Sequence, residues 1–398
     1  MSDHFYFNHK VSRYHSYLNT AVTILTNYKG EEPFAGYIKK FFAANKKYGS
    51  KDRKSISHLC YCYFRTGKAL PKLSVEDRIV AGLFLCSSEE NEILAFLKPA
   101  WNSNAGLSIE EKLVLIDKDL ILEQIFPWKE ECCEELEIEF FAESFLQQPD
   151  LFLRMRPGSE KQVKTKLRNG AIEFKSLNNS CIALSNNTKI DTLLEADKEV
   201  VIQDYSSQRV ADFFPINIDG AIKTVWDCCA ASGGKSILAN DVLTNIQLTV
   251  SDIRENILFN LNKRFSAAGI NNYKSFIADL SNSKQVVAAE SFDLIMADVP
   301  CSGSGTWSRT PEQLYYFELA KIDEYAKLQK SILKNVIMAL KPGGYFLYIT
   351  CSVFKKENKD AVNFLLENFN FKVLKMELLK GYEMKADSMF AALLQKQL

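Results

Sequence analysis

From about residue 221 onward, the chain alternates short apolar runs typical of strands with stretches typical of helices. We predict strands at "IKTVWD", "LTVSD", "KSFIAD", "FDLIMAD" and "GYFLYIT". Helices are expected from Lys235, from Glu255 and, as one long helix, from about Leu314 to Leu340. This alternation predicts an open, doubly wound sheet with a mostly parallel core. We therefore expect an α/β fold with a Rossmann-like sheet over residues 221–398.

Four of the predicted strands end in an aspartate, namely Asp227, Asp252, Asp279 and Asp298. A single aspartate at a strand end is most often the N-cap of the helix that follows. In doubly wound sheets, however, ligands bind at the carboxyl ends of the strands. Four carboxylates along this one edge therefore predict a shared ligand site.

The residues before the sheet fall into two further regions. Up to about residue 145, apolar residues recur at three- and four-residue spacing with almost no alternation, which predicts an all-helical domain over residues 1–145. Over residues 146–220, short alternating runs such as "FLRMR" and "EVVIQD" predict a small α+β connecting region. With 398 residues, the chain is long enough for several regions with cores of their own.

The formal net charge is zero, but the charged residues are unevenly distributed along the chain. Residues 1–70 carry 12 Lys and Arg against 4 Asp and Glu, whereas residues 71–150 carry 6 against 18. The basic N-terminal segment suits a phosphate-rich partner such as nucleic acid. Solvated helix faces would explain the same counts, so the charge alone leaves both interpretations open.

The positions of cysteine and histidine argue against a metal site. None of the ten cysteines forms a C-x-x-C pair, and all four histidines lie at or before His58. A metal site in the C-terminal half would need a ligand set without imidazole, which is uncommon. We therefore expect no metal.

We also expect a cytoplasmic protein with no membrane contact. No apolar run reaches the roughly 18 residues that a membrane span requires. The N-terminal "MSDHFYFNHKVSRYHSY" lacks the continuous apolar core of a signal peptide. Ten cysteines without a disulfide-like spacing suit a reducing compartment.

The stretch "DCCAASGGKS", residues 227–236, follows the first predicted strand of the sheet. Its small residues let the backbone approach a ligand at the start of a helix, where free N–H groups favour a carboxylate or a phosphate. "GGKS" is similar to the end of a phosphate-binding loop, but that motif requires glycine where this chain has Cys229. A P-loop-like nucleotide hydrolase is therefore the disfavoured alternative.

The spacing of the strand-end carboxylates favours a ligand that contains a nucleoside. Asp252 lies roughly 20 residues past the glycine loop, where ribose hydroxyls are usually bound. S-adenosylmethionine matches this edge, with its ribose hydroxyls at Asp252, its adenine amino group at Asp279 and its amino-acid end near Gly233. We therefore expect S-adenosylmethionine as the cofactor.

Asp298, Cys301 and Cys351 are predicted to meet beside this cofactor. "DVPCSGSGTW" begins at Asp298, and "YITCS" places Cys351 at the end of the next strand. Neighbouring parallel strands open into the same crevice at their carboxyl ends. Two thiols and a carboxylate suit methylation of cytosine at C5: a thiolate adds to C6, an acid supports the charge at N3, and a base later removes the C5 proton. Because a free thiol has a pKa of about 8.5, neighbours such as Lys235 must activate the nucleophile.

These residues resemble the Nop/Sun family of RNA cytosine-5 methyltransferases, and within it the bacterial enzymes that act on 16S rRNA. The matching stretches follow in order over about 160 residues and include "QDYSSQ", "DCCAASGGKS", "FDLIMADVPCSGSGTWSRTPE", "LQKSIL", "LKPGGYFLYITCS" and "ENKDAV". The N-terminal "YGSKDRKSISHLCYCYFR" is similar to a NusB-like helical domain. The resemblance thus implies a NusB-like RNA-binding domain over residues 1–145 and a methyltransferase domain over residues 221–398.

The resemblance also implies roles for individual residues. Cys351 matches the nucleophile of the family, Cys301 matches the cysteine that assists release of the methylated base, and Asp298 matches an acid near both cofactor and base. Two positions depart from the family: Ser232 stands where proline is usual, and Arg156 where asparagine is common. The residues expected to bind the cofactor are Cys229, Ala230, Ala231, Gly233, Gly234, Lys235, Asp252, Asp279 and Asp298.

Together, these features predict S-adenosylmethionine-dependent methylation of a cytosine at C5 in RNA, with 16S ribosomal RNA as the expected substrate. Cys351 would add to C6, and Cys301 would assist elimination after methyl transfer. The target cytosine is expected to be unpaired or flipped out, because a stacked base cannot expose C6 to a thiolate. We expect a monomer. A catalytically inactive RNA-binding scaffold is the second alternative, and it requires both cysteines to be dispensable.

Overall fold

The computed structural model describes residues 2–215, 222–282 and 287–398, which form two compact units. The helical unit comprises Met1–Glu130, Glu137–Gln148 and Trp307–Glu318, and the sheet unit comprises Glu131–Leu136, Pro149–Thr306 and Leu319–Leu398. The boundary predicted between residues 220 and 221 lies outside the described residues. Within the described ranges, none of the helices combines the length and the apolar character needed to cross a bilayer.

The N-terminal region is helical, as predicted. Polar side chains cap the start of α4 and α7: the Ser74 side chain accepts a hydrogen bond from the N–H of Asp77, and Ser108 forms a capping box with Glu111. The elements are α1 (Ser2–Asn27), α2 (Phe34–Ala44), α3 (Ser50–Arg65), α4 (Val75–Cys86), α5 (Glu92–Leu97), α6 (Pro99–Asn102), α7 (Ile109–Ile116), η1 (Leu122–Ile125), η2 (Lys129–Glu131) and α8 (Ile138–Ser144).

Aromatic side chains form the centre of the helical unit. The ring of Phe34 packs against those of Tyr28 and Phe64, with centroids 5.0 and 4.9 Å apart. The buried guanidinium of Arg78 lies 4.8 Å from the ring centroids of both Tyr63 and Tyr315. Cation–π contacts on two sides therefore compensate the burial of this charge.

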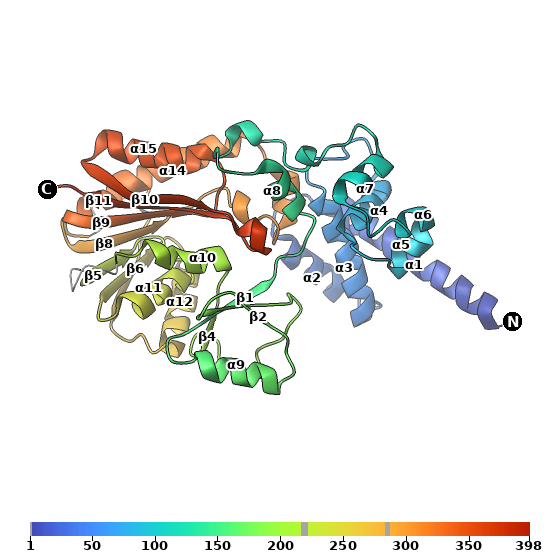
Figure 1. Cartoon of the computed structure of the whole chain (residues 1–398), viewed down its shortest axis with the longest axis horizontal. Helices are drawn as coiled ribbons and strands as arrows, with labels where there is room; N and C mark the ends of the chain where they lie inside the picture. Colours follow the sequence, from blue (N-terminus) through green and yellow to red (C-terminus); the bar gives the residue numbers. More distant parts are fainter. Residues whose placement is uncertain (1, 216–221, 283–286) are drawn as a thin grey trace. The chain divides into compact units, whose positions relative to one another are not determined.

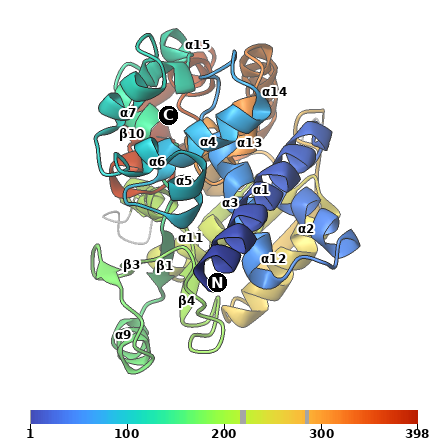
Figure 2. The same cartoon turned by 90° about the vertical axis from the view of Figure 1, so that its right-hand side faces the viewer.

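The segment Trp307–Glu318 follows the Cys301 loop in sequence but packs within the helical unit. It contains α13 (Pro311–Tyr316), which lies against α3 (Figure 2). The Tyr63 hydroxyl donates to the Tyr315 hydroxyl at 2.9 Å, and Glu312 accepts from the backbone N–H of Phe34 at 3.1 Å. The helical unit is thus built from segments that lie far apart in the sequence.

A small antiparallel sheet precedes the large one in the chain. Its strand order is β2-β3-β1-β4, and α9 (Glu160–Asn169) contributes Val163 and Leu167 to its core. This is the α+β arrangement expected for the connecting region. The remaining elements are β1 (Leu151–Met155), β2 (Lys175–Ser176), β3 (Cys181–Leu184), β4 (Val200–Ile202), α10 (Tyr205–Arg209) and η3 (Val210–Phe213).

The predicted doubly wound sheet is confirmed, with strand order β10-β11-β9-β8-β5-β6-β7. The pairs β5–β6, β6–β7, β5–β8 and β8–β9 are parallel. Helices α11 and α12 lie on one face of the sheet, and α14 and α15 lie on the other (Figure 1). The elements are β5 (Thr224–Asp227), α11 (Gly234–Leu243), β6 (Gln247–Asp252), α12 (Glu255–Ala267), β7 (Tyr273–Ile277), β8 (Phe292–Asp298), η4 (Ser304–Thr306), α14 (Ala320–Val336), η5 (Ile337–Ala339), β9 (Leu340–Thr350), η6 (Lys355–Glu357) and α15 (Lys359–Asn368).

Two features of the C-terminal half differ from the prediction. The single helix expected from Leu314 to Leu340 is wrong: α13 ends at Tyr316, α14 begins at Ala320, and β9 already starts at Leu340. The chain also ends in two antiparallel strands that were not predicted, β10 (Phe371–Leu379) and β11 (Met389–Lys396), with η7 (Gly381–Met384) between them. They extend the sheet beyond β9.

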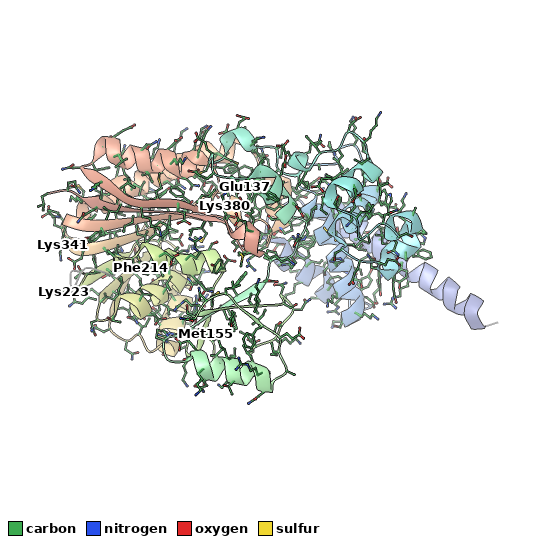
Figure 3. The ribbon with its side chains drawn as sticks, viewed as in Figure 1. Glu137, Met155, Phe214, Lys223, Lys341 and Lys380 are labelled. Carbon is green, nitrogen blue, oxygen red and sulfur yellow. The ribbon has the colours of Figure 1, made fainter. Side chains whose placement is uncertain are left out.

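The two ends of the parallel strands carry different chemistry. At the amino ends, the carboxylate of Asp293 accepts from the backbone N–H of Lys223 at 2.9 Å and from Nζ of Lys341 at 2.8 Å. Lys223 and Lys341 mark this end of the sheet in Figure 3. Cys301, Cys351 and the aspartates predicted at the strand ends lie at the opposite, carboxyl ends of the strands.

Candidate functional site

The carboxyl ends of β5, β6, β8 and β9 surround a cavity of about 420 Å³. Strand ends and the loops after them supply most of its wall, and α14 closes it with Leu328 and Ile332. The other lining residues are Cys228, Cys229, Ala231, Asp252, Ile253, Arg254, Ala278, Asp279, Leu280, Ser281, Asp298, Val299, Pro300, Cys301 and Cys351. The structure thus brings both predicted cysteines and three predicted carboxylates to one cavity.

Cys301 and Cys351 lie next to each other in the wall of this cavity. Their Sγ atoms lie 3.2 Å apart, and both side chains are partly exposed. The hydrogen bond with Cys351, together with burial, raises the pKa of Cys301 well above its usual value. Cys301 therefore keeps its proton and can donate a hydrogen bond to the sulfur of Cys351.

The loops that carry the two thiols are also tied together directly. The hydroxyls of Ser302, Ser304 and Ser352 lie 3.2–3.3 Å from one another. The backbone N–H of Gly305 donates to the carbonyl of Cys351 at 2.9 Å. A side chain at Gly305 would meet the carbonyl oxygen of Ser388 at 2.0 Å, so this approach of the backbones requires glycine.

Asp252 ends β6 and is held in place from two sides. Its carboxylate accepts from the backbone N–H of Ala231 at 3.1 Å and from Nε of Arg254 at 3.0 Å. Partial burial would raise the pKa of Asp252, but the hydrogen bonds from Arg254 lower it below its usual value. An ionised carboxylate at this position can accept hydrogen bonds from a pair of hydroxyl groups.

Asp279 and Asp298 have different partners. Ser281 donates to Asp279 at 2.6 Å and, with Asn282, lowers the pKa of this carboxyl. Asp298 accepts from Nζ of Lys235 at 2.7 Å. Lys235 does not line the cavity but reaches its wall through this ion pair.

Asp227, the fourth strand-end aspartate, does not line the cavity. It is 1% exposed, and its Oδ2 accepts from the Ser236 hydroxyl at 2.6 Å. Burial raises the pKa of Asp227 to about 7. The expectation that all four carboxylates gather at one ligand site therefore holds for three of them, because the start of α11 covers the first.

The glycine-rich loop places its predicted residues at different depths. Cys229 and Ala231 line the cavity, whereas Ala230, Gly233 and Gly234 do not. Gly233 precedes α11 with a φ of 81°, and a side chain there would lie 2.7 Å from the ring of Phe265. This glycine therefore permits a left-handed turn and close packing on α12.

The two positions that depart from the family are both bound within the sheet unit. Ser232 accepts hydrogen bonds from Arg264 at 3.0 Å. Arg156 forms an ion pair with Asp241 at 2.6 Å and donates to the carbonyl of Ala268 at 2.6 Å. Neither residue lines the cavity, so Arg156 stabilises the junction between the small and large sheets.

Several lining residues were not predicted from the sequence, and three of them help to shape the cavity. Arg254 donates hydrogen bonds to the carboxylate of Asp252. Its position two residues after the end of the strand could have predicted this contact. Leu328 and Ile332 come from α14 and lie four residues apart, on one face of the helix. Their place over the strand ends follows from the tertiary packing and from no local motif.

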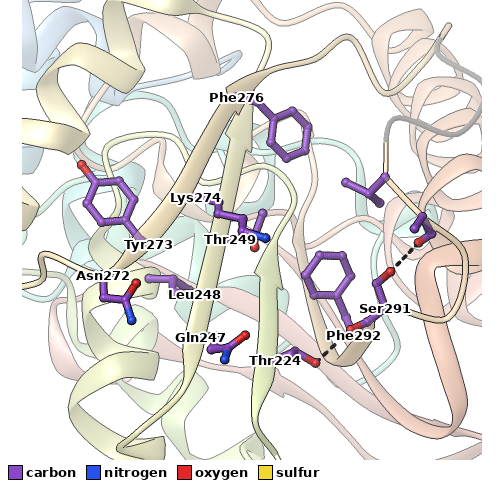
Figure 4. Close-up of a pocket in the computed structure, with 12 residues that line it drawn as sticks. Thr224, Gln247, Leu248, Thr249, Asn272, Tyr273, Lys274, Phe276, Ser291 and Phe292 are labelled. Atoms are coloured by element: carbon purple, nitrogen blue, oxygen red, sulfur yellow. Dashed lines mark hydrogen bonds between the residues drawn. The ribbon is translucent and has the colours of Figure 1, made fainter.

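A second pocket lies at the other end of the strands (Figure 4). Thr224, Gln247, Tyr273 and Phe292 line it, and these are the first residues of β5, β6, β7 and β8. The described residues that line it include no cysteine and no carboxylate. The chemistry predicted from the sequence is therefore concentrated at the carboxyl ends of the strands.

Comparison with known proteins points to one family. Residues 220–395 match the family described as "16S rRNA methyltransferase RsmB/F". The ribosomal RNA small subunit methyltransferase B of Xanthomonas campestris is 31% identical over 173 residues, which cover 43% of this chain and 39% of that protein. The probable ribosomal RNA small subunit methyltransferase B of Bacillus subtilis is 29% identical over 202 residues, which cover 50% and 44%. The matched residues span less than half the length of these curated relatives.

A solved structure resembles nearly the whole chain. The crystal structure of PH0851 has a TM-score of 0.68 and 18% sequence identity, and the match covers 94% of this chain and 97% of that one. At this identity the likeness concerns the fold alone. It supports the predicted combination of a helical N-terminal region with a Rossmann-like sheet.

Proposed function

We propose that the protein methylates C5 of a cytosine in RNA, a proposal supported by the match of residues 220–395 to the family described as "16S rRNA methyltransferase RsmB/F". The observation that carries the proposal is the pair of thiols, 3.2 Å apart, in a cavity that Asp298 also lines. Cytosine C5 becomes nucleophilic only after a nucleophile has added to C6. A thiol pair beside a carboxylate supplies the groups for this chemistry.

S-adenosylmethionine fits the remainder of the cavity. The carboxylates of Asp252 and Asp279 offer acceptors for ribose hydroxyls and an adenine amino group, and Ile253 and Leu280 provide apolar wall between polar groups. The backbone at Cys229 and Ala231 lies at the start of the loop before α11. When bound, the cofactor supplies an electrophilic methyl group.

In the proposed reaction, Sγ of Cys351 forms a bond to C6 of the cytosine. Its thiolate is stabilised by the hydrogen bond from Cys301, whose raised pKa keeps the proton on that sulfur. Asp298, which accepts from Nζ of Lys235 at 2.7 Å, would support the charge that develops on the ring. Once C5 carries the methyl group, the C5 proton passes to a base, for which the carboxylate of Asp298 is available in the cavity, and the released electron pair forms the C5–C6 double bond. The bond between C6 and Cys351 then breaks, its electron pair returns to Sγ as a thiolate, and Cys301 assists by donating a hydrogen bond to that sulfur.

The substrate that we propose is ribosomal RNA, with the cytosine unpaired or flipped out of its stack. Support comes from the 16S rRNA named in the matched family and from the excess of basic residues in the N-terminal 70 residues. We propose that residues 1–145 act as an RNA-binding helical domain and that the protein works as a monomer in the cytoplasm.

Transfer of tritium from labelled S-adenosylmethionine to RNA tests this function. RNA from cells that lack the protein serves as substrate, and bisulfite sequencing locates the product. We expect Cys351→Ala to lower the rate by on the order of 10⁴-fold or more. Cys86→Ala, which removes a thiol from the helical unit, serves as the matched control and should leave the rate unchanged. Full activity of Cys351→Ala would refute the proposed mechanism.

A further inference from the structure

Three buried polar side chains hold the thiol loops without lining the cavity. Gln329 lies on α14, Glu357 ends η6, and Asn358 precedes α15. All three are 0% exposed. Because burial of polar groups is costly unless they form hydrogen bonds, their partners indicate what they do.

Cys301 is held through the peptide groups on both of its sides. Nε2 of Gln329 donates to the carbonyl of Pro300 at 3.0 Å. The backbone N–H of Ser302 donates to Oε2 of Glu357 at 2.7 Å. The residues before and after Cys301 are therefore each fixed by a buried side chain from outside the loop.

Cys351 is held in the same manner by a single residue. Oδ1 of Asn358 accepts from the Thr350 hydroxyl at 2.5 Å, and Nδ2 of Asn358 donates to the carbonyl of Ser352 at 2.8 Å. The amide of Asn358 thus bridges the residues on either side of Cys351. No other side chain on this segment could replace both bonds, because an amide offers a donor and an acceptor together.

The supports of the two loops are connected to each other. Glu357 and Asn358 are adjacent in the chain, so one short segment holds both thiol loops. The Tyr348 hydroxyl lies 3.1 Å from Oε1 of Gln329 and 2.5 Å from the carbonyl oxygen of Glu357. The separation of the two sulfur atoms therefore depends on a rigid buried frame formed by Gln329, Tyr348, Glu357 and Asn358.

We infer that Gln329, Glu357 and Asn358 are positioning residues that set the distance between the Cys301 and Cys351 thiols. This inference rests on the proposed function, in which one thiol attacks the base and the other assists its release. A thiol displaced by about 1 Å can lose on the order of 100-fold in rate. The buried frame prevents such a displacement while it leaves the cavity free for substrate.

Dibromobimane tests the inference without RNA or cofactor, because this reagent becomes fluorescent when it joins two neighbouring thiols. Because Cys228 and Cys229 also line the cavity, the assay uses protein that carries Cys229→Ser. This protein should form the product between Cys301 and Cys351, and adding Cys301→Ser or Cys351→Ser should abolish it. We expect Asn358→Ala and Glu357→Ala to slow the cross-link by about tenfold or more, with kcat falling by up to about 100-fold and KM for S-adenosylmethionine changing less than about twofold. Asn363→Ala, at an exposed position of α15, is the matched control.

Conservative variants separate positioning from folding. Glu357→Gln keeps an acceptor for the N–H of Ser302 and should restore both cross-linking and turnover, whereas Asn358→Asp keeps the volume but loses the donor to Ser352 and should not. These two variants test whether Glu357 and Asn358 position the thiols even if the alanine variants fail to fold. Cross-linking of Asn358→Asp at the parent rate would overturn the inference and leave the proposed function intact. Conversely, an active Cys351→Ala would refute the function without changing the cross-linking result.

Discussion

Replacing Glu357 by glutamine should remove a strong pH dependence from the stability of the sheet unit. The Glu357 carboxyl is 0% exposed; its Oε2 accepts from Ser302, and its Oε1 has no partner among the described residues. Burial raises the pKa of Glu357 from 4.5 to about 7. The folded protein therefore favours the protonated form of this side chain.

The sign and size of the effect follow from this pKa. In the unfolded chain the carboxyl ionises near pH 4.5, whereas in the folded protein it keeps its proton up to about pH 7. Between these values the unfolded chain binds fewer protons, so the free energy of unfolding decreases as the pH rises. Since one pKa unit corresponds to about 1.4 kcal/mol, the buried carboxyl should cost the fold about 3 kcal/mol above pH 7.

Urea unfolding of the parent and of Glu357→Gln at pH 5 and pH 8 measures this cost. Glutamine cannot ionise, so the variant should gain about 2–3 kcal/mol over the parent between the two pH values. Asp360→Asn, which removes an exposed carboxyl from the same segment, should show no comparable gain. Parallel pH dependences of the parent and Glu357→Gln would refute the view that Glu357 is buried as a neutral acid.

Three further predictions concern the site and its support. Cys301→Ala should accumulate a covalent complex between the protein and RNA through Cys351, visible as a slow band on denaturing gels; no band would contradict the division of roles between the thiols. Asp252→Ala should raise KM for S-adenosylmethionine by about 10-fold to 100-fold, measured by methyl transfer at varied cofactor, because hydrogen bonds to a charged group contribute about 1.5–3 kcal/mol. Gly233→Ala should lower the free energy of unfolding by about 2–4 kcal/mol, through left-handed strain and the clash with Phe265. Gly269→Ala is its control, since it shares the positive φ but meets no atom within 4 Å, and an equal loss in both variants would exclude the packing contribution.

The carboxyl-end site could be predicted because its signals are local. Asp252 and Asp298 end their strands as expected, and parallel pairing then brings them and the two cysteines to the same edge. Asp227 ends its strand equally well but is covered by the start of α11. Strand ends thus define the edge of the sheet, whereas the following loop decides which side chain reaches the cavity.

Other features had no local signal. Residues before and after 317–319 both show the apolar spacing of a helix. Periodicity therefore predicted one long helix where the structure has two separate helices. Phe371–Leu379 alternates half-buried and exposed residues, but its apolar residues do not follow this alternation, since Leu374 and Met376 are exposed. Its pairing with β11 depends on contacts made after the chain returns. Glu357 and Asn358 belong to the matching stretch "ENKDAV", but their burial could not be predicted, because it arises from the packing of η6 against both thiol loops.

The late position of α13 in the sequence affects when the helical unit can finish folding during synthesis. Arg78 requires the ring of Tyr315, and the start of α2 requires the carboxylate of Glu312, yet both residues come after β8 in the sequence. During synthesis, the first 148 residues therefore emerge before Tyr315, when Arg78 has only the ring of Tyr63 for a cation–π contact. The helical unit can become complete only after the ribosome has also produced β8 and Cys301, whereas the thiol pair must wait for β9 and Cys351.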